Sequence, residues 1–106
     1  MPWVYLVIAG LFEVVWAFSM KQSDGFTRPG PTIVTIAAMI ASFALLSLSM
    51  KSLPLGTAYT IWTGIGAVGA FLVGIAMLGE PASAMRIVAA LLIVAGLVLM
   101  KISTPA

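Results

Sequence analysis

The chain has 106 residues, of which 62% are hydrophobic and only 8% are charged. Soluble domains average roughly 25% charged residues, so this composition predicts a membrane protein. The absence of cysteine and histidine excludes disulfides, thiol chemistry and metal sites built from those ligands. The five basic residues are scattered between apolar segments rather than gathered in a stripe, so we expect no nucleic-acid partner. We also expect no cofactor.

The charged residues divide the chain into long apolar segments. The uncharged segments are residues 29–50, 52–79 and 87–100, and a further apolar segment, residues 3–20, contains only Glu13. Spanning a hydrocarbon core of roughly 30 Å takes about 20 helical residues, and no segment alternates with the period of two expected of a barrel strand. We therefore predict an all-α membrane protein with one domain over residues 1–106. Its four transmembrane helices are expected at about 3–21, 32–50, 55–77 and 83–101.

Glu13 lies near the middle of the first predicted span. An acidic residue at that depth costs on the order of 3 kcal/mol on insertion scales, and such residues usually serve ion or proton pathways. Gly10 and Trp16 share its helix face. Gly10 leaves space beside the carboxylate, and Trp16 brings an indole N–H to it. The alternatives are a protonated glutamate that only holds helices together and a tryptophan in an interfacial belt.

The second and third predicted helices supply further candidates. Ser42 lies deep enough to hydrogen-bond Glu13, although membrane serines more often bond their own backbone. Met39, one turn away, is a candidate for the lining of an access portal, with simple packing as the alternative. Tyr59 and Trp62 share a face of the third helix, where aromatic rings beside a carboxylate suit an organic cation. Ordinary helix packing would also explain them.

Small residues mark two other places. Gly64 and Gly66 belong to a glycine-rich run in the third helix that predicts a kink, although close packing explains it equally well. Ala89 and Gly96 are two turns apart on one stripe of the fourth helix, which suits a dimer interface.

The orientation of the chain in the membrane is almost undecided by charge. Positive residues mark the cytoplasmic side. Here one face would carry Lys21, Arg28 and Arg86, and the other Lys51 and Lys101. One hypothesis is insertion in both orientations, and the alternative is a weak but sufficient bias. Because four helices leave little room for a sealed cavity, we expect a homodimer. Two antiparallel copies would place both Glu13 side chains around one cavity, with the inverted symmetry of larger transporters.

Three stretches of sequence resemble the small multidrug resistance family. Two of them resemble its guanidinium-exporter subtype: Gly10-Leu11-Phe12-Glu13-Val14-Val15-Trp16-Ala17, and Lys21 followed by Ser23-Asp24-Gly25-Phe26-Thr27-Arg28. The third resembles the third-helix signature of the family, which does not separate the subtypes: Leu53-Pro54-Leu55-Gly56-Thr57-Ala58-Tyr59-Thr60-Ile61-Trp62-Thr63-Gly64-Ile65-Gly66-Ala67. The first helix indicates the subtype, because multidrug members normally have glycine at the position of Trp16. One departure is Ala89, where the dimer stripe of the family often starts with glycine.

The resemblance implies an antiparallel, dual-topology homodimer in a bacterial inner membrane that exchanges protons for guanidinium ions. Glu13 would bind both substrate and proton, and Gly10 would leave room for the cation. Trp16, Ser42, Tyr59 and Trp62 would surround Glu13. The main alternative is a broad exporter of quaternary ammonium or aromatic cations. A non-transporting membrane assembly protein is less expected, and an enzyme least, because the membrane segments contain no nucleophile–base pair.

Overall fold

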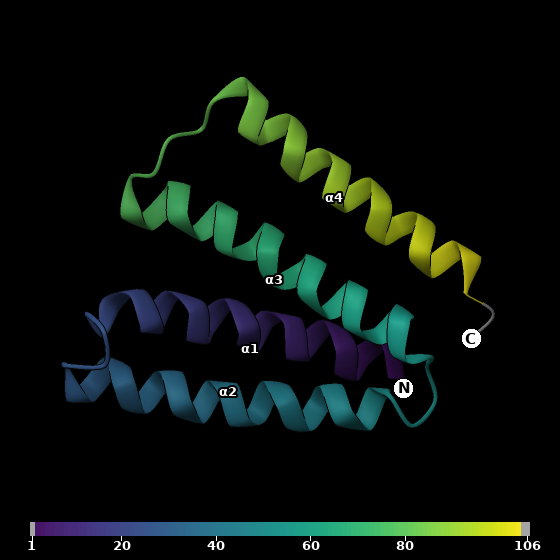
Figure 1. Cartoon of the computed structure of the whole chain (residues 1–106), viewed down its shortest axis with the longest axis horizontal. Helices are drawn as coiled ribbons and strands as arrows, with labels where there is room; N and C mark the ends of the chain where they lie inside the picture. Colours follow the sequence, from purple (N-terminus) through teal and green to yellow (C-terminus); the bar gives the residue numbers. More distant parts are fainter. Residues whose placement is uncertain (1, 105–106) are drawn as a thin grey trace.

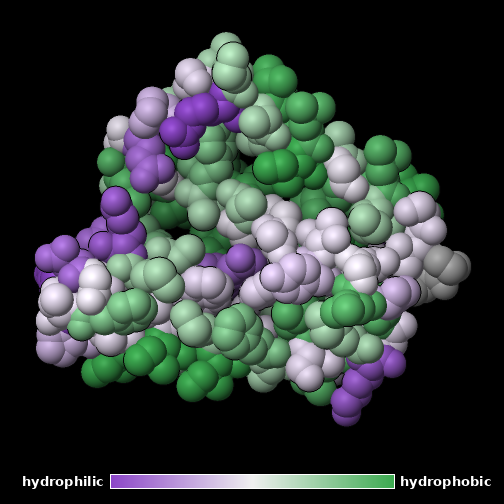
Figure 2. Space-filling view, in the orientation of Figure 1, coloured by the Kyte–Doolittle hydropathy of each residue, from purple (hydrophilic) through white to green (hydrophobic). Residues whose placement is uncertain are grey.

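The structure, a computed structural model, describes residues 2–104 and consists of four α-helices in this range. They are α1 (Pro2–Gln22), α2 (Pro29–Ser49), α3 (Leu55–Leu78) and α4 (Ala84–Ser103). All four are long and apolar enough to cross a membrane, as predicted. Hydrophilic side chains gather mainly at the helix ends, and hydrophobic ones cover most of the length between them (Figure 2).

Local sequence explains where the helices begin and end. The observed bounds differ from the predicted ones by three residues at most, and the largest difference is that α2 begins at Pro29. Prolines are tolerated there because first-turn N–H groups have no acceptor within the helix. α3 ends at Leu78 and is capped by Gly79, which adopts the left-handed conformation at φ 68°. The Ser83 side chain caps α4 by accepting a hydrogen bond from the Arg86 backbone N–H at 3.3 Å.

The helices lie nearly in one row rather than in a four-membered bundle. Figure 1 shows α1 between α2 and α3, with α4 on the far side of α3. The molecule measures 43 × 34 × 16 Å, so it is little thicker than one helix with its side chains, about 10–12 Å. The buried core lies where α1, α2 and α3 meet. It comprises Leu6, Ala9, Leu46, Leu53, Ala58, Ile61 and Trp62.

α4 lies at the edge of this core, which it contacts through the partly buried side chains of Leu97 and Met100. None of its residues is buried, and its helical neighbour is α3. Cation–π contacts join α4 to the other helices near both of its ends. The Arg86 guanidinium lies 5.3 Å from the centre of the Phe71 ring, and the Lys101 amine lies 4.8 Å from the centre of the Trp3 ring. A groove of about 520 Å³ separates α3 from α4. In a single chain, most of the surface of α4 is therefore not covered by other helices.

Candidate functional site

Glu13 is half-buried in the middle of α1 and faces α3. Its carboxylate lies directly against Gly66, where the Cβ of any other residue would overlap Oε1. Oε1 is buried, and residues 2–104 offer it no hydrogen-bond partner. In an apolar membrane layer such an oxygen is costly unless a proton or a cation satisfies it. Glu13 is therefore not part of a closed hydrogen-bond network among the described residues, and its role in binding stays a prediction.

Trp16 adds a second unsatisfied polar atom one turn along α1. Its indole Nε1 is buried, and it too has no hydrogen-bond partner among the described residues. Trp16 and Glu13 share a helix face because they are three positions apart. An N–H donor and a carboxylate oxygen thus lie in the same part of the membrane layer with their bonding capacity unused.

Ser42 connects three helices. Its hydroxyl donates to the backbone oxygen of Ala9 in α1 at 2.7 Å. The Ser42 hydroxyl oxygen in turn accepts a hydrogen bond from Trp62 Nε1 in α3 at 2.9 Å. Ser42 is fully buried, and its partners are these two groups rather than Glu13, to which the sequence suggested a bond. The hydroxyl therefore fixes the indole N–H of Trp62 at the junction of the three helices.

The aromatic rings form a continuous wall. Phe43 lies edge-on to Trp16 with ring centres 6.3 Å apart. Its centre is 5.8 Å from that of Trp62, and the Trp62 centre is 5.6 Å from that of Tyr59. Trp62 is buried, whereas Phe43 and Tyr59 are 47% and 54% exposed. The Phe43 and Tyr59 rings of this wall are therefore exposed on one side of the single chain.

Phe43 is a member of the wall that the sequence analysis missed. Its position four residues after Met39 puts it on the same face of α2, and this spacing is the signal that identifies it. Met39 itself is half-buried on α2. Its role as an access portal stays a prediction.

The small residues of the site pack closely in this structure. The space beside Gly10 is filled by Ile65, and the open side of Gly64 is filled by Leu97 of α4. Gly66 makes room for Glu13. α3 is one helix from Leu55 to Leu78. These glycines therefore serve close approach here, and the predicted kink at Gly64 and Gly66 stays a prediction.

Ala89 and Gly96 both lie exposed on α4. Nothing lies within 4 Å of the place that a Cβ of Gly96 would occupy. Both residues are thus accessible to a second copy, as a dimer interface requires. Their contact with such a copy stays a prediction.

Comparisons with known proteins agree with the resemblance seen in the motifs. A family model described as "Small Multidrug Resistance protein" matches residues 1–103. Proteins named "Guanidinium exporter" from Citrobacter freundii and Salmonella typhimurium are each 59% identical over 98% of this chain and 99% of their own length. The protein of that name from Escherichia coli K12 is 57% identical over the same shares.

These matches also bear out the expected class and location. The relatives are named as exporters rather than enzymes, and they come from bacteria. Together with four apolar helices, this places the chain in the bacterial inner membrane as a multi-pass protein. The match covers all four helices and all three motif stretches. The chain belongs to the small multidrug resistance family.

Proposed function

We propose that this chain exports guanidinium and small substituted guanidinium cations in exchange for protons, with both ligands competing for Glu13. The observation that carries the proposal is the buried Glu13 Oε1, which has no partner among residues 2–104 although it lies in the membrane layer. The names of the relatives support the choice of guanidinium as substrate.

The chemistry of guanidinium suits this surround. It is planar, permanently charged and weakly hydrated, and two of its N–H groups can bond both oxygens of one carboxylate. The faces of the Tyr59 and Trp62 rings attract a cation through their quadrupoles. The bond from Trp62 Nε1 to Ser42 keeps that donor turned away from a positively charged ligand.

Competition for one charge explains coupling. A proton on Glu13 removes the charge that holds the cation, and a bound cation occupies the oxygens that would accept the proton. Neither ligand remains when the other binds, so the two fluxes are opposite and linked. Acidifying the side from which the cation binds therefore raises its apparent KM. A KM that does not change with pH would contradict competition.

We further propose that the working unit is an antiparallel homodimer. A single chain is only 16 Å thick, leaves the Phe43 and Tyr59 rings exposed and buries no residue of α4. A second copy would cover these surfaces and bring a second Glu13 to the same cavity. The near balance of positive charge, three residues against two across the two faces, supports insertion in both orientations.

The test measures substrate-evoked current in proteoliposomes. We expect current with guanidinium and little with tetrapropylammonium, which has no N–H donor. Glu13→Gln, which keeps the shape of the side chain and removes its charge, should abolish proton-coupled current. Asp24→Asn is the matched control, because it removes one acidic charge from an exposed loop residue.

Three results would contradict the proposal. Equal currents for both cations would indicate a multidrug exporter. Silence for both in a folded dimer would indicate a protein that does not transport. Proton-coupled current retained in Glu13→Gln would show that Glu13 is not the shared residue.

A further inference from the structure

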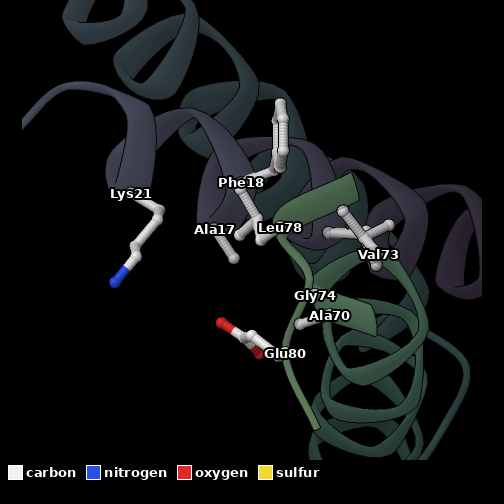
Figure 3. Close-up of a pocket in the computed structure, with 9 residues that line it drawn as sticks. Ala17, Phe18, Lys21, Ala70, Val73, Gly74, Leu78 and Glu80 are labelled. Atoms are coloured by element: carbon white, nitrogen blue, oxygen red, sulfur yellow. The ribbon is translucent and has the colours of Figure 1, made fainter. Parts of the chain in front are cut away.

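A separate pocket of about 210 Å³ lies where α1 and α3 end. Apolar side chains form most of its lining, and two charged residues complete it. These are Lys21 in the last turn of α1 and Glu80 just after α3. Figure 3 shows the Lys21 amine and the Glu80 carboxylate on separate sides of one hollow. The site around Glu13 uses neither residue.

The end of α3 holds Glu80 in place. The backbone N–H of Glu80 donates to the Gly74 oxygen at 3.0 Å. The Glu80 carboxylate lies directly against Gly74, where a Cβ would overlap Oε1. A carboxylate beside the negative end of a helix dipole is disfavoured. A cation in the pocket would relieve this repulsion, because it would be attracted both by Glu80 and by the end of α3.

Two facing rows of residues connect this pocket to Glu13. They are Glu13, Ala17 and Lys21 on α1, and Gly66, Ala70 and Gly74 on α3. Members of each row are four positions apart and share a helix face. The Glu13 carboxylate lies against Gly66 and the Glu80 carboxylate against Gly74. Gly66 and Gly74 are eight positions apart, and eight helical residues rise about 12 Å. The two carboxylates therefore lie beside points on α3 that are about 12 Å apart along its axis.

We propose that Glu80 forms a peripheral cation subsite, where a guanidinium ion is held between Glu13 and the water at this end of the helices. This inference rests on the proposed function and names a second binding step for its substrate. Ala17 and Ala70 line the pocket on the side toward Glu13 and leave space between the helices. Lys21 lines the same hollow with a positive charge, so it weakens the subsite and favours release of the ion.

A different role for the same two residues gives an opposite expectation. If Lys21 and Glu80 served as an ion pair that closes the pocket, neutralising either partner would break the same contact. Both variants would then change transport in the same direction. In a cation subsite Glu80 attracts the ligand and Lys21 repels it, so the two variants change KM in opposite directions.

The experiment compares guanidinium transport by Glu80→Gln and Lys21→Gln in proteoliposomes. An exposed charge pair is worth up to about 1 kcal/mol, so we expect Glu80→Gln to raise KM about threefold to fivefold and Lys21→Gln to lower it by a similar factor. Asp24→Asn and Arg28→Gln are matched controls. They remove the same charges from exposed residues outside the pocket lining and should leave KM unchanged.

Binding is then measured without transport. In a Glu13→Gln background, guanidinium chloride should shift the Gly74 and Glu80 amide resonances, and sodium chloride at equal ionic strength should not. Adding Glu80→Gln should remove the shift. Absence of the shift, or KM changes of the same sign in the two single variants, would overturn the subsite. If the unsubstituted protein does not transport guanidinium but the shift is still seen, the proposed function is overturned and the subsite stands.

Discussion

Replacing Ser42 with alanine removes one oxygen that joins three helices. Its hydroxyl donates to the Ala9 backbone oxygen at 2.7 Å and accepts from Trp62 Nε1 at 2.9 Å. All three residues are buried. Ser42→Ala leaves the indole N–H of Trp62 without its acceptor and removes the side-chain donor from the Ala9 carbonyl, in a layer where water does not replace the hydroxyl.

The expected magnitude follows from these two bonds. Hydrogen bonds between membrane helices average about 0.6 kcal/mol and reach about 1.7 kcal/mol. Loss of both should lower the free energy of unfolding by about 1–3 kcal/mol. The Trp62 ring also loses the bond that sets its position beside Phe43 and Tyr59, so the KM for guanidinium should rise.

The assay is reversible unfolding in mixed detergent micelles, with transport measured on the same samples. Ser47→Ala is the control, because it makes the same substitution on an exposed face of α2. Trp62→Phe removes the donor but keeps a ring. A double-mutant cycle between Ser42→Ala and Trp62→Phe should give a coupling free energy of about 0.6–1.7 kcal/mol.

Two results would refute this reasoning. Equal unfolding free energies for Ser42→Ala and Ser47→Ala would mean that the hydroxyl does not join the helices. Single-variant effects that simply add would mean that the bond between Ser42 and Trp62 contributes nothing measurable.

Two further substitutions test the close packing on α3 and the exposed stripe on α4. Gly66→Ala places a methyl group where the Glu13 carboxylate lies, and overpacking of about 1–3 kcal/mol should lower kcat/KM by about tenfold or more. Gly56→Ala on the same helix meets nothing within 4 Å and should transport normally, and equal activity of the two variants would contradict the contact. Gly96→Leu should reduce the dimer fraction measured by light scattering, whereas Ala95→Leu, on the neighbouring face of α4, should not. An unchanged dimer fraction in Gly96→Leu would place Gly96 outside the interface.

Much of the architecture could be predicted from the linear pattern of charge. Long uncharged segments must be helices if they cross a membrane, because a lone segment there has no other way to satisfy its backbone hydrogen bonds. Prolines and short polar loops then limit where each helix can end. The charge pattern thus indicates the four spans, and it singles out Glu13 because a carboxylate at that depth needs a ligand or a proton.

Helical periodicity also indicated which residues share a face with Glu13. Trp16 follows from its spacing on α1, and Trp62 from the matching face of α3. Periodicity does not show how far each helix is rotated or shifted against its neighbour. The motif stretches suggested roles for particular residues only through their resemblance to a family.

The contacts between helices depended on rotation and register, which arise from packing in three dimensions. Only the folded chain brings Gly66 against Glu13, Ile65 against Gly10, and Ser42 against the Ala9 carbonyl rather than the carboxylate. The pocket between Lys21 and Glu80 has the same origin. These two residues are 59 positions apart in the sequence, and they line one hollow because α1 and α3 run side by side in the same direction.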